Sequence, residues 1–174
     1  MEETTVSIIG IMIAVLLMFV VPLVTIADRN DDISQLTVQT LTADFVDKVV
    51  RLGQIRSDDY NEFITRLATS GNTYDIDIEV KILDENPPKS QIDANPSEVG
   101  SKVYYSLYTS QIEEKFRTYD TILLKEGDVV SVVAKNNSKT LSQALKSVYY
   151  TIKGEDLHII SSTATATVAV NGAI

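Results

Sequence analysis

His158 is the only histidine in the 174-residue chain, and it is the first residue to consider for catalysis because a Ser-His-Asp triad needs an imidazole base. It lies in a stretch of alternating polar and apolar residues, and no G-x-S-x-G nucleophile motif occurs in the sequence. Phosphate-binding loops of the G-x-x-x-x-G-K and G-x-G-x-x-G types are absent as well. We therefore expect a non-enzymatic protein with no catalytic residues, no cofactor and no small-molecule substrate, in which His158 is structural or solvent-facing.

Asp75, Asp77 and Glu79 form an acidic row whose hard oxygen atoms would suit a calcium ion. They alternate with apolar residues, as side chains on one face of a β-strand do, so that neighbouring carboxylates stand roughly 7 Å apart. The EF-hand loop with its turn glycine is missing. The chain also has no cysteine for a thiolate site. We interpret the row as a solvated face and expect no metal site.

Tyr104, Tyr105 and Tyr108 form a candidate interaction patch, because tyrosine is enriched at binding hot spots. Alternation along a strand would place at least one of the three in the core. They follow residues 84–100, which hold three of the four prolines and which we expect to form a long surface loop. The loop and the tyrosines together could recognise a partner.

The chain that positions these side chains begins with an uncharged apolar run over residues 4–27. The run is long enough to cross a bilayer as one helix, because about 20 residues at ~1.5 Å each span the roughly 30 Å hydrocarbon core. A cleavable signal peptide is the alternative interpretation. The acidic start with Glu2 and Glu3, the length of the run and the lack of a small-x-small cleavage site favour an uncleaved anchor over residues 1–32. We expect a single-pass protein of the cell membrane, with the lipid bilayer as a partner.

Three residues inside the apolar run have structural consequences. Gly10 and Ala14 form a small-xxx-small pair, which allows helices to approach closely in lipid and suggests self-association. Pro22 removes one helical hydrogen bond and should kink the helix.

The side of the membrane on which the rest of the chain lies is only weakly encoded. Arg29 is the one basic residue close to the run, and taken literally it favours a cytoplasmic domain. Large domains, however, cross membranes largely regardless of charge, and the absence of cysteine suits an exported chain. We expect the C-terminal domain to be extracytoplasmic or part of a surface filament. A formal net charge of −9, without a cluster of lysine and arginine to offset it, argues against nucleic acid as a partner.

Residues 33–174 are long enough for one α+β domain. Two helices are predicted at its start, over about 33–53 and 57–70. The first has an apolar stripe that ends at Gly53; its members are Val38, Leu41, Phe45, Val49 and Leu52. No glycine or proline separates it from the anchor, so the two could form one continuous helix. The stripe should pack on the sheet of its own domain. Ser57 is the expected N-cap of the second helix and Gly71 its C-cap, with Tyr60, Phe63, Ile64 and Leu67 buried.

The residues after these two helices are predicted to form an antiparallel sheet with two short helices. Strict alternation predicts a half-buried strand over residues 73–83. Strands are also expected at 102–108, 129–135 and 157–170, the last with small residues that allow close packing. Ser110 and Glu113 form an expected capping box ahead of a short helix, and a second helix is predicted over 139–150, with Leu141, Ala144, Leu145 and Val148 as its stripe.

The chain resembles the pilin-like and TadE-like membrane-anchored proteins of bacterial type IV filament and tight-adherence secretion systems, of the Gram-positive type. The likeness lies in the helix order, in the segment from Gln35 to Tyr74, and in the later KEGDVVSVVAKN and TIKG segments. It implies a long N-terminal helix against which a small C-terminal domain packs. In true pilins a carboxylate near the start of the apolar helix pairs with a neighbouring subunit, and a proline lies within it. Glu2 or Glu3 and Pro22 match these in kind.

Two functions from different classes remain as hypotheses. The resemblance favours a pilin-like or minor-pilin-like structural subunit of a surface filament or secretion apparatus, assembled with itself or with other pilin-like subunits through the N-terminal helix. The alternative is a single-pass membrane-anchored binding or adhesion module that recognises a partner through its sheet domain.

Overall fold

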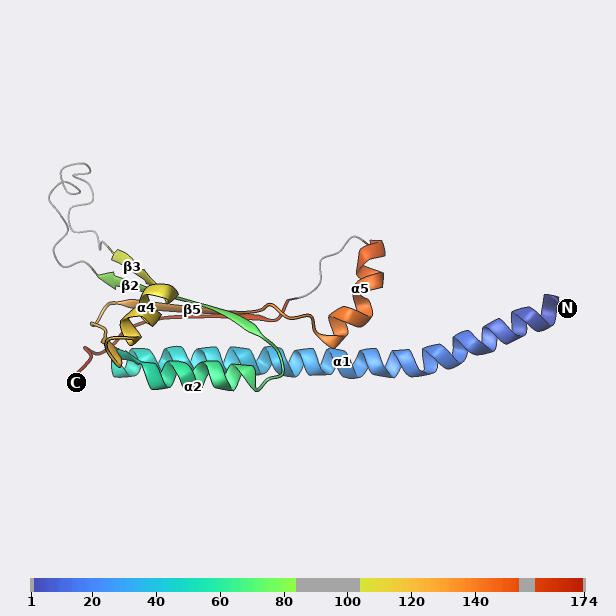
Figure 1. Cartoon of the computed structure of the whole chain (residues 1–174), viewed down its shortest axis with the longest axis horizontal. Helices are drawn as coiled ribbons and strands as arrows, with labels where there is room; N and C mark the ends of the chain where they lie inside the picture. The colour runs from blue at the N-terminus through green and yellow to red at the C-terminus, as the bar shows by residue number, and fades with distance from the viewer. Residues whose placement is uncertain (1, 84–103, 154–158, 174) are drawn as a thin grey trace, which may run out of the picture.

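The computed structural model describes residues 2–83, 104–153 and 159–173. The fold is α+β, as predicted from the sequence. A helix of 51 residues, α1 (Glu2–Leu52), runs the whole length of the molecule, and a small antiparallel sheet lies against its C-terminal half (Figure 1).

Helix α1 passes from the apolar run into the amphipathic stretch without a break, so the anchor and the first helix of the domain are one element. Pro22 is accommodated inside the helix, which curves in its apolar part and is straight along the sheet (Figure 1). The helix ends where expected: Gly53 follows it with a positive φ of 63°, a backbone conformation that favours glycine.

The main sheet has four strands in the order β3-β2-β5-β6, and every neighbouring pair is antiparallel. Its strands are β2 (Tyr74–Leu83), β3 (Tyr104–Tyr108), β5 (Val129–Asn136) and β6 (Ser161–Thr167). Strands β1 (Gln54–Arg56) and β4 (Thr121–Leu123) pair in a separate two-stranded ribbon. The sequence did not predict this ribbon, because three residues are too few for a periodic signal.

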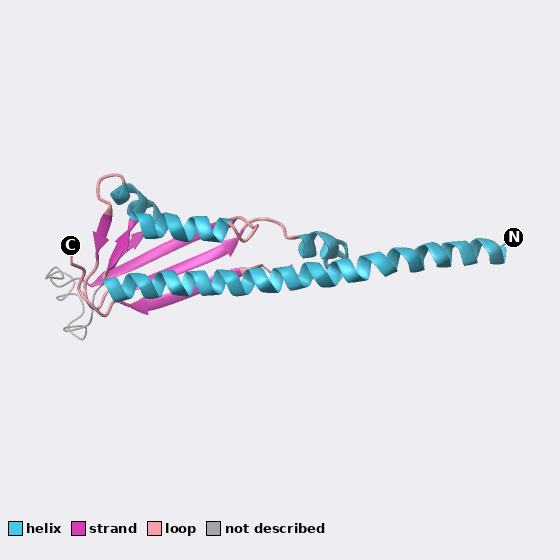
Figure 2. Cartoon of the chain, turned by 90° about the horizontal axis from the view of Figure 1, so that it is seen from below, coloured by secondary structure: helices cyan, strands magenta, loops and turns pink. Residues whose placement is uncertain are grey.

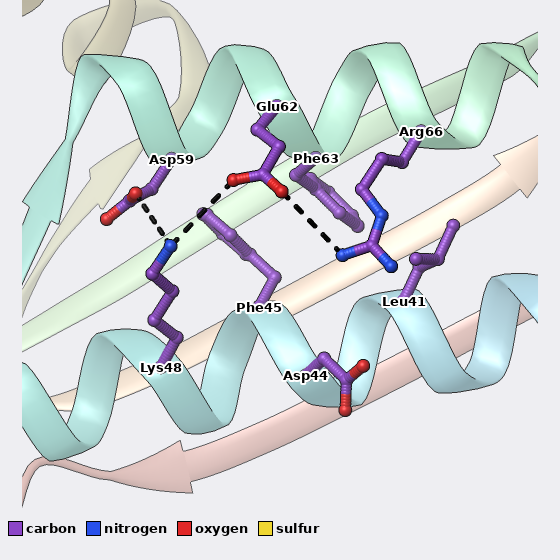
Figure 3. Close-up of a pocket in the computed structure, with 8 residues that line it drawn as sticks. All are labelled: Leu41, Asp44, Phe45, Lys48, Asp59, Glu62, Phe63 and Arg66. Carbon is purple, nitrogen blue, oxygen red and sulfur yellow. Dashed lines mark hydrogen bonds and ion pairs between the residues drawn. The ribbon is translucent and has the colours of Figure 1, made fainter.

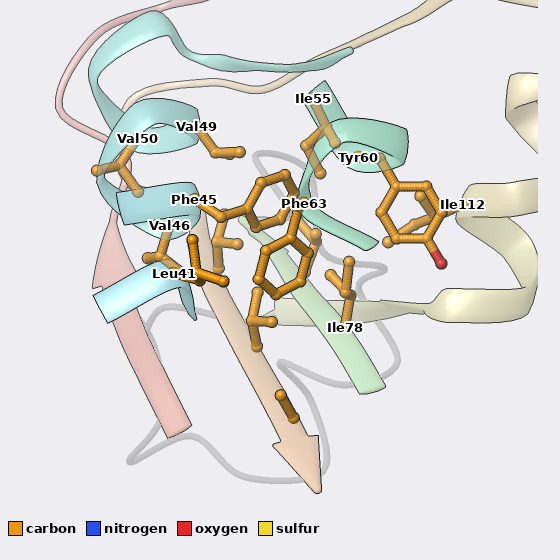
Figure 4. Packing of buried hydrophobic residues seen from close by; sticks show 14 of the residues in the cluster. Leu41, Phe45, Val46, Val49, Val50, Ile55, Tyr60, Phe63, Ile78 and Ile112 are labelled. Atoms are coloured by element: carbon orange, nitrogen blue, oxygen red, sulfur yellow. The ribbon is translucent and has the colours of Figure 1, made fainter. Parts of the chain in front are cut away.

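Helices α1 and α2 (Ser57–Ala68) lie side by side on one face of the sheet, so that α2 folds back on α1 (Figure 2). The rings of Phe45 and Phe63 stack between them with centroids 4.6 Å apart. Figure 4 shows this cluster extending to Ile78 in the sheet and to Ile112 in α4 (Thr109–Phe116). The core is therefore a single layer between the helices and one sheet face.

The stripe of α1 does pack on its own domain, with one correction. Val38, Leu41, Phe45 and Val49 are buried, whereas Leu52 is 44 % exposed because it lies in the last helical position beyond the sheet contact. Val46 and Val50 widen the buried face instead.

Strand β6 supplies the small residues against which α1 packs. Ala164 and Ala166 point to the core face and are partly buried there. Their short side chains let the helix backbone come close to the edge of the sheet. The predicted strand is too long at its C-terminal end, since β6 stops at Thr167 and Val170 is exposed.

The expected helix caps are wrong. Strand β1 runs directly into α2, so Arg56 is the N-cap, and the amide of Ser57 donates instead to the carbonyl of Asp120 (2.9 Å). At the other end α2 closes at Thr69, before Gly71. Helix α4 starts at Thr109, which places Ser110 inside it, and the Gln111 side chain accepts the hydrogen bond from the Tyr108 amide (3.0 Å).

The predicted stripe of α5 (Leu141–Lys153) is also wrong where the structure describes its side chains. Leu141 is 55 % exposed and Ala144 is exposed, while Ser142 and Gln143 are buried. The cause is tertiary, because α5 contacts α1 through its polar side chains.

Candidate functional site

The N-terminal half of α1 has no packing partner in the domain. Every residue from Glu3 to Leu23 is exposed, including most of the large apolar side chains of the run, from Val6 to Leu23. Among the residues that the structure describes, α1 is the one helix long and apolar enough to cross a membrane. Exposed apolar surface of this extent marks a site that contacts lipid or other proteins.

The predicted assembly residues all lie on this exposed half. Glu2 and Glu3 are in the first turn of α1, ahead of the apolar run. Gly10 and Ala14 are one helical turn apart and therefore share a face. A Cβ atom added at Gly10 would meet no atom within 4 Å, so the domain itself does not require glycine there. Pro22 lies near the end of the exposed part.

The contact of α1 with the domain begins at Ala27, which is buried, and continues through the buried Ser34 to the apolar stripe. The spacing Ala27, Asp31, Ser34, Val38 continues the stripe backward at intervals of three and four residues. The sequence pattern alone does not reveal this extension, because these residues are small or polar. The position of the junction is therefore fixed just after the apolar run.

Asp28 is the centre of a polar cluster at this junction. The Lys146 ammonium lies 2.6 Å from its carboxylate, and the Ser142 hydroxyl donates to the same oxygen. The Thr140 hydroxyl donates to Asp31 Oδ2 (2.8 Å), one turn further along α1. The hydrogen bond from Lys146 and then that from Ser142 hold the pKa of Asp28 below its usual value. These contacts attach the first turns of α5 to α1.

A second polar contact closes the edge of the sheet beside α1. The Gln35 side chain donates from Nε2 to the Ser161 carbonyl (2.7 Å) and accepts from the Ser161 amide at Oε1 (3.1 Å). The amide group thus pairs with the start of β6 as a neighbouring strand would. No sequence pattern distinguishes this glutamine from any surface residue.

The three tyrosines of the candidate patch lie on edge strand β3 and do not form one surface. Tyr104 and Tyr108 fall on the outer face with Ser106, while Tyr105 falls on the opposite face with the core residue Leu107. Tyr105 and Tyr108 are 55 % and 57 % exposed and Tyr104 is half-buried. The expectation that one of them is a core residue is wrong, because Leu107 occupies that register position opposite Val80.

Tyr108 borders an open hollow of about 540 Å³ on the outer sheet face. The hollow is also lined by Asp77, Glu79, Thr109 and Ser131. Its walls combine hydroxyl and carboxylate groups with apolar surface such as that of Val133, which would suit a partner that has both polar and apolar groups. The predicted loop over residues 84–100 and His158 lie outside the described residues.

The acidic row engages polar side chains of neighbouring strands and turns. Asp75 accepts a hydrogen bond from Asn137 Nδ2 (2.7 Å), and Glu79 accepts one from the Ser106 hydroxyl (2.7 Å). Within the described ranges, no group of three or more histidine, aspartate or glutamate side chains could hold a metal ion.

Charged side chains cross between α1 and α2 above the Phe45 ring (Figure 3). Lys48 pairs with Asp59 (2.8 Å) and lies 3.9 Å from Glu62, which in turn faces Arg66 at 3.8 Å. The groove between these side chains is small and open to solvent, with a volume of about 60 Å³. We interpret this groove as part of the helix packing.

Fold and exposed helix together define a class of protein, an α+β domain carried on a helix that could cross a membrane. Comparison with protein families, with curated proteins and with solved structures finds no match. What the chain does must therefore be inferred from its geometry.

Proposed function

We propose that this chain is a non-enzymatic, pilin-like or minor-pilin-like structural subunit, anchored and assembled through the N-terminal half of α1. The observation that supports this proposal is the division of one continuous helix into two parts. Residues 3–23 have no partner in the domain, whereas Ala27–Val50 supply a wall of its core.

A helix that exposes its large apolar side chains from Val6 to Leu23 is not stable as a free element in water, so it needs a lipid or protein environment. A bilayer satisfies it because all backbone hydrogen bonds are internal to the helix. Neighbouring copies of the same helix would satisfy it equally in a filament. In either environment the domain stays directly joined to the anchoring segment, because α1 belongs to both parts.

The proposal places the domain outside the cytoplasm. Protease treatment of intact cells tests this side of the membrane: an extracytoplasmic domain is digested, while a soluble cytoplasmic marker protein survives. A domain that is protected until the cells are lysed contradicts the placement.

The assembly itself is tested by negative-stain electron microscopy of material sheared from cells that express the protein, with an antibody against residues 33–174. A structural subunit appears as labelled thin filaments. Label that remains with the cell envelope contradicts the filament role and favours an anchored accessory or binding protein.

Close helix packing in the assembly should depend on the small pair. Gly10→Leu and Ala14→Leu are expected to reduce the sheared, high-molecular-weight fraction, because a bulky side chain keeps neighbouring helices apart. The domain stays folded, since nothing in the chain lies within 4 Å of the Gly10 Cβ position. Ile11→Leu is the matched control, with its volume conserved. Wild-type assembly of both bulky variants would remove the small-residue argument.

A second candidate function is supported by the hollow beside Tyr108. In this alternative the chain is an anchored binding module that recognises a partner on the outer sheet face. Retention in the membrane after shearing, with partner binding that is lost in Tyr108→Ala and kept in Tyr119→Ala, would favour it.

A further inference from the structure

Helix α5 occupies an unusual position. It extends sideways from α1 at the level where the apolar run gives way to the domain: it is transverse to α1 in Figure 1 and is seen foreshortened in Figure 2. The contact is made by Asp28, the first charged residue after the run, with Ser142 and Lys146 of α5. If α1 crosses a membrane along its axis, α5 lies in the plane of the membrane surface.

The exposure of α5 is inverted relative to a helix on a water-soluble domain. Its polar Ser142 and Gln143 are buried, while Leu141 is 55 % exposed and Leu145 is only half-buried. A helix normally buries its apolar face and leaves its polar face in water. An apolar face left without a protein partner is explained when lipid covers it.

The sequence of this segment fits a membrane interface. The spacing of Leu141 and Leu145 continues at Val148 and Ile152, which is the period of one helical face. Residues 139–153 contain three lysines and no acidic residue, in a chain whose net charge is −9. Two adjacent tyrosines, at 149 and 150, are of a type enriched at the level of lipid headgroups. The chain as a whole is acidic and would repel anionic lipid, whereas this segment carries only positive charges.

We propose that α5 is a second membrane contact, an interfacial helix that rests on the bilayer surface with the face of Leu141 and Leu145 in lipid. The proposal rests on the anchoring of α1 that is part of the proposed function. The Asp28–Lys146 pair and the Ser142 hydrogen bond attach α5 to α1 at headgroup level. The domain then has two points of attachment, which fix its height and tilt above the membrane.

The absence of tryptophan from the chain allows a direct test. Leu141→Trp introduces a single tryptophan at an exposed position, in the full-length protein reconstituted into nanodiscs of phosphatidylcholine and phosphatidylglycerol. Its emission is compared between ordinary lipid and lipid brominated close to the headgroup. We expect emission to fall to about half, because an interfacial helix buries its apolar face roughly 5–10 Å into the headgroup and acyl boundary.

Two matched single-tryptophan variants separate the possible failures. Phe19→Trp, in the apolar run, reports on the anchor when deeply brominated lipid is used, and Tyr119→Trp, just after α4 at the far end of the molecule, reports on water-exposed surface. Quenching of positions 19 and 141 but not of 119 supports the proposal. Quenching of position 19 alone overturns the role of α5 and leaves the anchor intact.

The remaining outcomes would show that water or protein, and not lipid, surrounds position 141, or that the anchor itself is not in lipid. A tryptophan at position 141 that aqueous acrylamide quenches and lipid bromine does not is in water, which overturns the proposal. A tryptophan at position 141 that neither quencher reaches is covered by protein, such as a second copy of the chain. That result overturns the proposal as well. Loss of lipid quenching at position 19 overturns the anchor and with it the inference about α5.

Discussion

At the residue scale, Gly53 joins three segments that are distant in sequence. Its carbonyl accepts a hydrogen bond from the Leu124 amide (2.8 Å), and the Leu124 carbonyl accepts one from the Gly172 amide (2.9 Å). A Cβ atom added at Gly53 would lie 2.2 Å from the Val170 carbonyl oxygen and 2.6 Å from the Gly172 nitrogen. The end of α1 and the C-terminal segment thus approach at a distance that only glycine permits.

Gly53→Ala should therefore destabilise the domain by roughly 2–5 kcal/mol, the sum of a left-handed backbone penalty and an overpacking penalty. Gly71→Ala is the control, because Gly71 also has a positive φ but open space around its Cβ position. Its cost should be only about 1–2 kcal/mol. Denaturant unfolding of the full chain in detergent, followed by circular dichroism, measures both; equal losses would show that the close approach is unimportant.

Tyr60 is a buried residue whose ionisation should limit stability at high pH. Its hydroxyl donates to Glu113 Oε1 (2.8 Å), and its ring contacts that of Phe116 with centroids 5.7 Å apart. Burial, and then the hydrogen bond to Glu113, raise the pKa of Tyr60 well above its usual value.

Because the folded-state pKa is raised, the neutral phenol's stabilising contribution is complete below the unfolded-state pKa of about 10 and is lost as pH rises from there toward the folded-state pKa. The free energy of unfolding of the wild type should fall more steeply above about pH 10 than that of Tyr60→Phe, which has no phenol to ionise at this position. Subtracting one pH profile from the other removes the contributions that the other tyrosines and the lysines make to the pH dependence. Parallel profiles would contradict the assignment.

At the scale of the element, α1 is one helix with two environments. Its buried face runs from Ala27 to Val50, while residues 3–23 contact nothing in the domain. Substitutions of the same residue type in the two halves should therefore have different effects on folding.

Phe45→Ala should cost roughly 3–5 kcal/mol in unfolding free energy, because it empties the stack with Phe63 in the core. Phe19→Ala, in the exposed half, should leave domain stability within about 0.5 kcal/mol of the wild type. Thermal and denaturant unfolding in detergent distinguishes them. A comparable loss in Phe19→Ala would mean that the apolar half of α1 does pack on the domain.

At the scale of the whole molecule, the domain should not need the apolar half of its long helix. A chain of residues 27–174 retains every buried residue of the core cluster, since the cluster begins at Val38. We expect it to be soluble, monomeric and cooperatively folded, and to be absent from the sheared fraction. Size-exclusion chromatography and circular dichroism check this; a truncated chain that aggregates or unfolds without cooperativity would show that residues 2–26 belong to the fold.

The sequence by itself determined the features that depend on neighbours along the chain. An unbroken apolar run defines a helix that could cross a membrane, spacing of three and four residues defines the buried stripe through Phe45, and strict alternation defines β2. Gly53 marks the end of α1 for the same local reason. These signals are carried by side-chain periodicity and backbone preference, which need no tertiary information.

Only the tertiary structure decided which polar residues meet. The hydrogen bond from Ser142 to Asp28 joins residues 114 positions apart, and it turned the predicted apolar stripe of α5 away from the domain. The register of β3 against β2 separated Tyr105 from Tyr104 and Tyr108. A pairing as short as that of β1 with β4, or a single side-chain contact, leaves no periodic pattern in the sequence. The free energy that selects such contacts comes from partners that only folding brings together.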